Sequence, residues 1–197
     1  MKIKKVKYLL KKGEFHKSEE FNSLMIEIKT AITAVSWHEA DIFVINPTKM
    51  GNGVKPIKNA CMSMLKDYGW KLEGRMPISS EESPGPVDAV KKVSNEKLFA
   101  LEWETGNISS THRALNKMAL GLLNDKLVCG ILVLPSKKFY RFLTDRVGNY
   151  DEIEPYFPIW KKLKIKSGVL GIIEIEFDGT SKNAPLIPKG TDGRALR

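Results

Sequence analysis

Amphipathic helices alternate with short apolar strands along this chain, and that alternation restricts the fold more than any other feature. In residues 17–37 the apolar side chains recur every three or four positions, the spacing that places them on one face of a helix; they are Phe21, Leu24, Met25, Ile28, Ile32 and Val35. Apolar runs of strand length follow at residues 97–104, 127–135 and 168–177. This order of elements, which contains no internal repeat, predicts an α/β fold.

The remaining elements follow from the same periodicities and from turn residues. We expect a strand at 40–47, a helix at 54–70 with Gly69 as its C-cap, a strand through Asp88, and helices at about 110–123, 136–147 and 150–163. Residues 78–88 are rich in Pro, Gly and Ser and are predicted to form a surface loop. The 197 residues, 42% of them hydrophobic, suffice for one domain spanning 1–197. From about residue 178 the chain is predicted to be a flexible tail.

The charge of the chain favours a polyanionic partner. Lys and Arg total 32 and Asp and Glu total 23, so the formal net charge is +9. Simple solubility is the competing explanation of that charge. Cys61 and Cys129 lie in apolar surroundings, which indicates reduced core thiols rather than a disulfide scaffold. The sequence shows no signal peptide and no apolar run of membrane-spanning length, so we expect a cytoplasmic protein.

Three carboxylates stand in or beside the strands that precede residue 105. If residues 98–104 form a strand, Glu102 and Glu104 point to the same face, and Asp88 on a neighbouring strand supplies a third acid. Neighbouring carboxylates repel each other unless a cation lies between or beside them. Hard oxygen ligands together with a substrate phosphate suit Mg²⁺. The spacing alone more often indicates the solvated polar face of an amphipathic strand, and the metal site is favoured by the basic charge of the chain and by the sequence that follows.

Side-chain types that read DNA bases follow immediately after these acids. Asn107, Ser109 and Arg113 cluster where the helix at 110–123 begins, and Asn, Ser and Arg can pair with base edges in a major groove. Asp145 and Arg146 form a second such group. Ordinary capping by Ser109 or Ser110 and a surface ion pair are the competing explanations.

Five blocks of sequence carry a family resemblance. They are "NGVKPIK" at 52–58, "GPVD" at 85–88, "EWETGNISSTHRALNK" at 102–117, "FLTDRVGNYDEIEPYF" at 142–157 and "NAPLIPKGTDG" at 183–193. With these blocks the chain resembles the BamHI family of type II restriction endonucleases over about three quarters of its length. The resemblance implies the restriction-endonuclease core of the PD-(D/E)xK superfamily, with a central mixed β-sheet flanked by helices. It also implies a homodimer, Mg²⁺, and cleavage of double-stranded DNA at the palindrome GGATCC after its first G, which leaves 5′ overhangs.

The resemblance further implies roles for individual residues. The metal ligands fall on Asp88, Glu102 and the backbone carbonyl of Trp103. Two further active-site acids fall on Glu104, where most of the superfamily has lysine, and on Glu73. The base-reading residues fall on Asn107, Ser109, Arg113, Asp145 and Arg146, and those of a minor-groove tail fall on Asp192 and Gly193. The dimer interface falls on Leu122, Leu123, Pro158, Ile159 and Trp160. A cognate DNA methyltransferase is expected in the same cell, without a stable complex.

Other functions remain open from the residues alone. A repair or junction nuclease needs the acids but not the base-reading residues, and a non-catalytic DNA-binding protein needs the opposite. A hydrolase of small phosphates does not require a net charge of +9.

Overall fold

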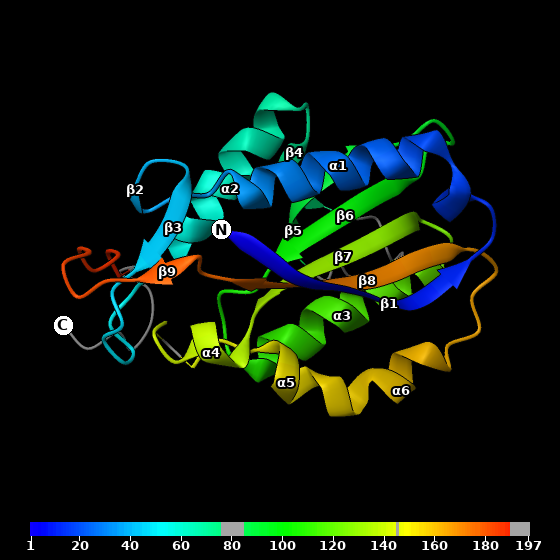
Figure 1. Ribbon diagram of the computed structural model, residues 1–197. Helices are drawn as coiled ribbons and strands as arrows, with labels where there is room; N and C mark the ends of the chain where they lie inside the picture. The colour runs from blue at the N-terminus through cyan, green and yellow to red at the C-terminus, as the bar shows by residue number, and fades with distance from the viewer. Residues whose placement is uncertain (76–84, 145, 190–197) are drawn as a thin grey trace.

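A six-stranded mixed β-sheet forms the centre of the molecule (Figure 1). The computed structural model describes residues 1–75, 85–144 and 146–189. The strands lie in the order β1-β8-β7-β6-β5-β4, with β6, β7 and β8 parallel and the outer pairs antiparallel. Their bounds are β1 Lys2–Lys12, β4 Lys71–Arg75, β5 Pro86–Lys92, β6 Leu98–Trp103, β7 Leu127–Pro135 and β8 Gly168–Glu176.

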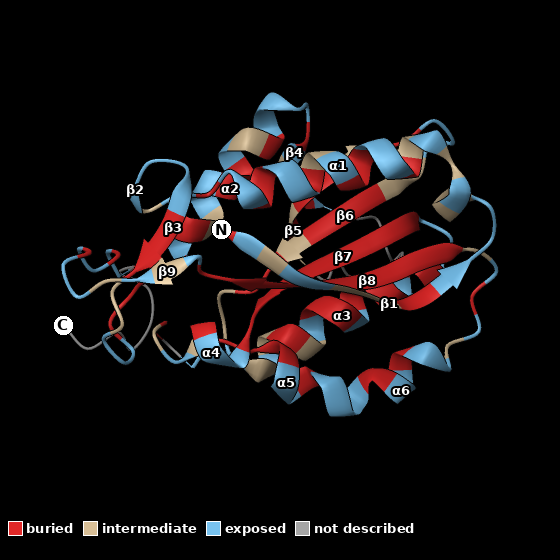
Figure 2. Cartoon of the chain, in the orientation of Figure 1, coloured by how far each residue is buried: buried red, intermediate tan, exposed pale blue. Residues whose placement is uncertain are grey.

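Helices cover both faces of this sheet. On one face lie α1 (Glu19–Thr33) and α2 (Lys55–Asp67), and on the other lie α3 (Ile108–Leu123), α5 (Tyr150–Ile153) and α6 (Phe157–Lys161) (Figure 1). Every residue of β7 and β8 is buried (Figure 2), because these two apolar strands are central and are covered on both sides. The hydrophobic core therefore has two parts, one on each face of the sheet.

The predicted α/β fold is confirmed, and the regions that depart from the predicted elements have local causes. The helix predicted at 136–147 is only one turn, α4 (Lys137–Tyr140). The helix predicted at 150–163 is divided into α5, a 3-10 turn (Glu154–Tyr156) and α6, with Pro155 and Pro158 each in the first turn of a new segment. Proline has no backbone N–H and cannot continue a preceding helix, so a new helical segment begins at each proline.

The C-terminal segment is ordered further than predicted. A small sheet contains β2 (His38–Glu39), β3 (Ile42–Ile45) and β9 (Gly179–Thr180), so the chain does not become a free tail at residue 178. Trp37 Nε1 donates to the carbonyl of Pro185 at 2.9 Å, and Ala184 and Ile187 are buried. The few apolar side chains in this segment are enough to anchor it as far as residue 189. Residues 190–197, including Asp192 and Gly193, lie outside the described residues.

Candidate active site

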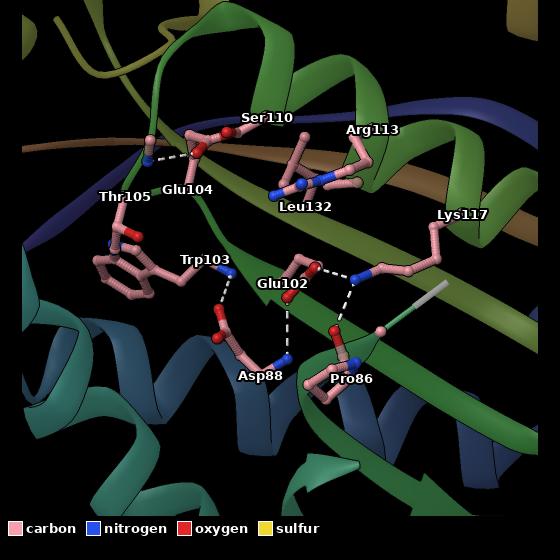
Figure 3. A pocket seen from close by; sticks show the side chains of 13 residues that line it. Pro86, Asp88, Glu102, Trp103, Glu104, Thr105, Ser110, Arg113, Lys117 and Leu132 are labelled. Atoms are coloured by element: carbon pink, nitrogen blue, oxygen red, sulfur yellow. Dashed lines mark hydrogen bonds and ion pairs between the residues drawn. The ribbon is translucent and has the colours of Figure 1, made fainter. Parts of the chain in front are cut away.

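A cavity of about 390 Å³ opens where β5 and β6 meet the beginning of α3 (Figure 3). Its polar lining comes from these three elements and the turn after β6: Asp88, Glu102, Glu104, Thr105, Ser110, Arg113 and Lys117. Residues 86–88 and 102–106 are therefore brought against one face of α3. No helix among the described residues is long and apolar enough to cross a membrane.

Asp88 and Glu102 are linked by two backbone N–H groups, one from Asp88 and one from Trp103. The Asp88 N–H donates to Glu102 Oε2 at 2.9 Å, and the Trp103 N–H donates to Asp88 Oδ2 at 2.8 Å. These bonds hold the two carboxylates next to each other on the adjacent antiparallel strands β5 and β6. Burial raises the pKa of Glu102 and the charge of Asp88 raises it further, while Lys117 opposes both effects. The pair is an electrostatically unfavourable arrangement that attracts cations.

Each of these carboxylates has a lysine partner. Lys58 Nζ of α2 lies 2.8 Å from Asp88 Oδ1, and Lys117 Nζ of α3 lies 2.6 Å from Glu102 Oε1. The sequence analysis did not identify Lys117 as a site residue. The available signal was the spacing of Arg113 and Lys117, because residues four apart lie on one face of a helix.

Glu104 is buried and follows directly after the end of β6. Its Oε1 accepts a hydrogen bond from the Gly106 N–H at 2.6 Å. Burial raises the pKa of this carboxyl group to about 7, although hydrogen bonds from Thr111 and Gly106 favour the charged form. A carboxylate with that pKa exchanges a proton readily near neutral pH, which suits a general base.

The candidate base-reading residues of α3 stand beside this cavity. Asn107, Ser109 and Arg113 are exposed, and Arg113 also lines the cavity. Neither Ser109 nor Ser110 caps α3, so that expectation is wrong. Asn107 is the N-cap, and its side chain accepts hydrogen bonds from the N–H groups of Ser109 at 3.0 Å and Ser110 at 3.4 Å. Its Oδ1 must leave these bonds before the Asn107 side chain can accept from a base.

A backbone contact ties the second candidate group to the first. Gly148 N–H donates to the Gly106 carbonyl at 2.9 Å, which holds the loop after Arg146 against the turn that precedes α3. A Cβ atom at Gly148 would meet Thr111 Oγ1 at 2.0 Å, so this close approach requires glycine. Arg146 is exposed and has a φ of 50°. Asp145 lies outside the described residues.

Glu73 is the acid that the structure does not bring into the cavity. It is exposed on β4, has a φ of 50°, and is absent from the cavity lining. The pairs Leu72–Ala89 and Gly74–Val87 place its backbone opposite Asp88 in the sheet register. The backbone of Glu73 therefore lies opposite that of Asp88, but the Glu73 side chain does not line the cavity.

Two of the five residues predicted for the dimer interface are buried inside this chain. Leu122 and Trp160 belong to the core between α3, α6 and the sheet, and Trp160 Nε1 donates to Asn116 Oδ1 at 3.0 Å. The prediction is wrong for these two because the apolar stripes of α3 and α6 face the sheet. The other three, Leu123, Pro158 and Ile159, are exposed, and Ile159 has 59% of its surface accessible.

The donor set of the cavity fits a hard divalent cation. Asp88 and Glu102 offer carboxylate oxygens in a water-accessible site, and each of them has one lysine partner. Within the described residues, no three side chains of His, Cys, Asp or Glu form a group able to hold a metal ion. Two carboxylates that need water and a substrate phosphate to complete the coordination shell are the pattern typical of Mg²⁺.

Similarity to a solved structure identifies the fold of this chain, and sequence similarity identifies its family. The crystal structure of the restriction endonuclease BglII complexed with a DNA 16-mer superposes with a TM-score of 0.62 at 10% identity, over 90% of this chain and 79% of that chain. This likeness shows that the chain has a restriction-endonuclease-like fold. The sequence model described as "Restriction endonuclease BamHI" matches residues 1–194. The chain belongs to the BamHI family.

Individual relatives agree with this assignment. The chain is 52% identical to the type II restriction enzyme OkrAI of Oceanobacter kriegii, over the full length of both proteins. It is 38% identical to the type II restriction enzyme BamHI of Bacillus amyloliquefaciens, over 87% of this chain and 82% of that enzyme. It is therefore a type II restriction endonuclease, a site-specific deoxyribonuclease that binds DNA.

Proposed function

We propose that this enzyme hydrolyses double-stranded DNA at GGATCC, cutting after the first G to leave 5′ overhangs. The observation that carries the proposal is the cavity that joins Asp88, Glu102 and Glu104 to the first turns of α3. In this proposal the catalytic acids and the base-reading residue Arg113 line one cavity. The recognition sequence itself is inferred from the resemblance of residues 102–117 and 142–157 to the BamHI family.

Divalent cations are the cofactors that enzymes of this class generally use, and Mg²⁺ fits the present site. Asp88 and Glu102 are the side chains that would hold it, with the Trp103 carbonyl as a further donor in our proposal. Bound there, a divalent cation lowers the pKa of water and neutralises charge on the scissile phosphate.

The residues of the chain then perform the remaining steps. Glu104 accepts a proton from the attacking water, whose oxygen forms a new bond to phosphorus as the bond to the 3′ oxygen breaks. The 3′ oxygen takes a proton from solvent, which leaves a 3′ hydroxyl and a 5′ phosphate. Arg113 and Lys117 bring positive charge to the same cavity and favour the binding of a phosphate group.

A homodimer follows from the symmetry of the proposed site. A palindrome presents two equal half-sites, and a two-fold dimer matches them with two copies of one surface. Exposed apolar residues on α3, the 3-10 turn and α6 could form that contact: Leu120, Leu123, Tyr156 and Ile159. Sedimentation at micromolar concentration should show a dimer, and a monomer would contradict the assembly.

The base-reading roles of Asn107, Ser109, Arg113, Asp145 and Arg146 are part of the same proposal, as is a minor-groove role for Asp192 and Gly193. Deletion of residues 190–197 should weaken specific binding to a GGATCC duplex more than it lowers the melting temperature. Unchanged affinity would remove the tail from recognition. Because the host DNA contains the same sequence, a cytoplasmic enzyme of this kind also requires a methyltransferase that protects it.

Plasmid digestion tests the whole proposal. The purified protein and Mg²⁺ should produce discrete fragments whose mapped ends lie within GGATCC, and EDTA should abolish cleavage. A junction or repair nuclease would nick irregular structures without a sequence preference. A DNA-binding protein without catalytic activity would retard the GGATCC duplex and leave it intact.

A further inference from the structure

Lys117 is a charged side chain that reaches the cavity from inside the protein. Its side chain is only 7% exposed, and Nζ donates to Glu102 Oε1 at 2.6 Å and to the Pro86 carbonyl at 2.7 Å (Figure 3). A buried ammonium group is costly unless it is paired and hydrogen-bonded. Lys117 therefore contacts the Glu102 side of the acid pair, whereas Asp88 is paired with Lys58.

The position of Lys117 complements that of Glu104. Glu104 stands where the resemblance implies a lysine in most of the superfamily, and Lys117 enters the same cavity from α3. Arg113 lies one turn earlier on the same face of α3 and also lines the cavity. The cavity therefore contains an ammonium group although position 104 is an acid.

We propose that Lys117 is the internal counter-ion of the metal site: it holds Glu102 in place before a divalent cation binds, and afterwards it supplies the ammonium group that position 104 lacks. This inference rests on the proposed function, in which Asp88 and Glu102 hold the cation.

Two opposing effects follow from this arrangement. Without metal, Lys117 offsets the repulsion between Asp88 and Glu102, which makes it a competitor of the incoming cation. With metal and DNA bound, the same ammonium group faces a phosphate that carries negative charge, and its attraction for that phosphate favours cleavage. Removing the charge should therefore strengthen metal binding and slow the reaction. A side chain with a purely structural role would weaken both when removed.

The test measures metal binding separately from activity. Mg²⁺ is titrated calorimetrically into the DNA-free parent protein, Lys117→Met and Lys117→Gln, and plasmid cleavage is then timed at saturating Mg²⁺. We expect both variants to bind Mg²⁺ at least about tenfold more tightly and to cleave at least about tenfold more slowly than the parent. The glutamine variant retains a donor for the Pro86 carbonyl, which separates the charge from that structural contact.

Lys91→Met is the matched control. Lys91 pairs with Glu27 at 2.8 Å and is also half-buried on the sheet, but it does not line the cavity. Its loss should leave Mg²⁺ affinity and the cleavage rate at the parent values. If either Lys117 variant that melts cooperatively binds Mg²⁺ no more tightly, or cleaves at the parent rate, the inference is overturned. Failure of the parent itself to cut GGATCC would instead overturn the proposed function, because the Mg²⁺ titration would still report on Lys117.

Discussion

Two pairs of glutamates with the same spacing lie in this sheet, and their surroundings give them different properties. Glu102 and Glu104 lie at the end of β6, and Glu174 and Glu176 lie at the end of β8. In the β8 pair, Lys4 Nζ lies between the two carboxylates, 3.2 Å from Glu174 and 3.3 Å from Glu176. In the β6 pair, Lys117 contacts Glu102, whereas Glu104 is held by Gly106 and Thr111.

The pKa of Glu176 shifts in the opposite direction to the pKa values of Glu102 and Glu104. Burial disfavours the charge of Glu176, but hydrogen bonds from Ser136 and Lys4 and the charge of Lys138 outweigh it, so the pKa of Glu176 is lowered. Burial dominates at Glu102 and Glu104, and the pKa of each is raised. Two glutamates on one strand face therefore form a stabilising ion cluster when cations satisfy both, and a reactive site when the charge is left incompletely compensated.

The largest contrast should appear in catalysis. Glu102→Gln removes half of the carboxylate pair and should reduce GGATCC cleavage at least about 1000-fold, because a metal ion contributes several kcal/mol to the transition state. Glu174→Gln changes the corresponding first glutamate of the β8 pair and should leave the cleavage rate within about twofold. Cleavage time courses at saturating Mg²⁺ distinguish the two, and comparable losses in both variants would remove the distinction between the pairs.

Replacing the carboxyl group of Glu104 should stabilise the folded protein above pH 7. Its pKa is raised from 4.5 to about 7 in the folded protein, so the folded state binds this proton more tightly and loses stability as pH rises from 4.5 to 7. The difference corresponds to a cost of up to about 3 kcal/mol above pH 7. Glu104→Gln should therefore be inactive but melt at a higher temperature than the parent at pH 8. Thermal melts should converge near pH 4, and a lower melting temperature at pH 8 would contradict this account.

Glu176→Gln should change stability in the opposite direction and by less. The pKa of Glu176 is lowered, so its charge stabilises the folded state above the unfolded-state pKa and this contribution is lost as pH falls through the folded-state pKa, below 4.5. Because Lys4 and Lys138 are largely exposed, we expect a loss of only about 1 kcal/mol at pH 7. Melting curves should show the variant 2–4 °C lower, at roughly that energy, and the gap should close near pH 3.

The smallest effect is expected for Lys4→Met. Lys4 is 42% exposed, and solvent screens its interactions with both carboxylates, so its removal should cost less than about 1 kcal/mol. The loss should shrink further at 1 M salt, where screening is stronger. Denaturant unfolding at low and high salt measures both quantities. A loss larger than that of Glu176→Gln would show that Lys4, rather than the hydrogen bond from Ser136, organises the β8 pair.

Local periodicity predicted the elements that surround the cavity. The spacing of two along β6 placed Glu102 and Glu104 on one face, and the repeat of three and four along α1 identified its buried residues. The identical spacing of Glu174 and Glu176 shows the limit of that reasoning, since only the folded sheet places Lys4 between them. Lys117 was missed for the same reason: its partner Glu102 is on another element.

Tertiary packing also decided the features that were predicted incorrectly. Leu122 and Trp160 have apolar side chains suited to an interface, but the orientation of α3 and α6 against the sheet buries them. The strands β1 and β4 were not predicted, because their lysines and charged residues hide the apolar alternation that a half-covered strand usually shows. Edge strands often carry lysine, and β1 and β4 are the two edges of the sheet.

The pairing of β1 with β8 has a consequence for the order in which the protein can fold during synthesis. Lys2 pairs with Glu176 and Lys12 pairs with Gly168, so the first strand is made long before its partner leaves the ribosome. At a translation rate of roughly 5–20 residues per second, β1 is without its partner strand β8 for about 10–30 s. Its six lysines in eleven residues keep that waiting segment soluble and discourage it from pairing with another nascent chain. The charge that conceals β1 in the sequence thus protects it until β8 has been made.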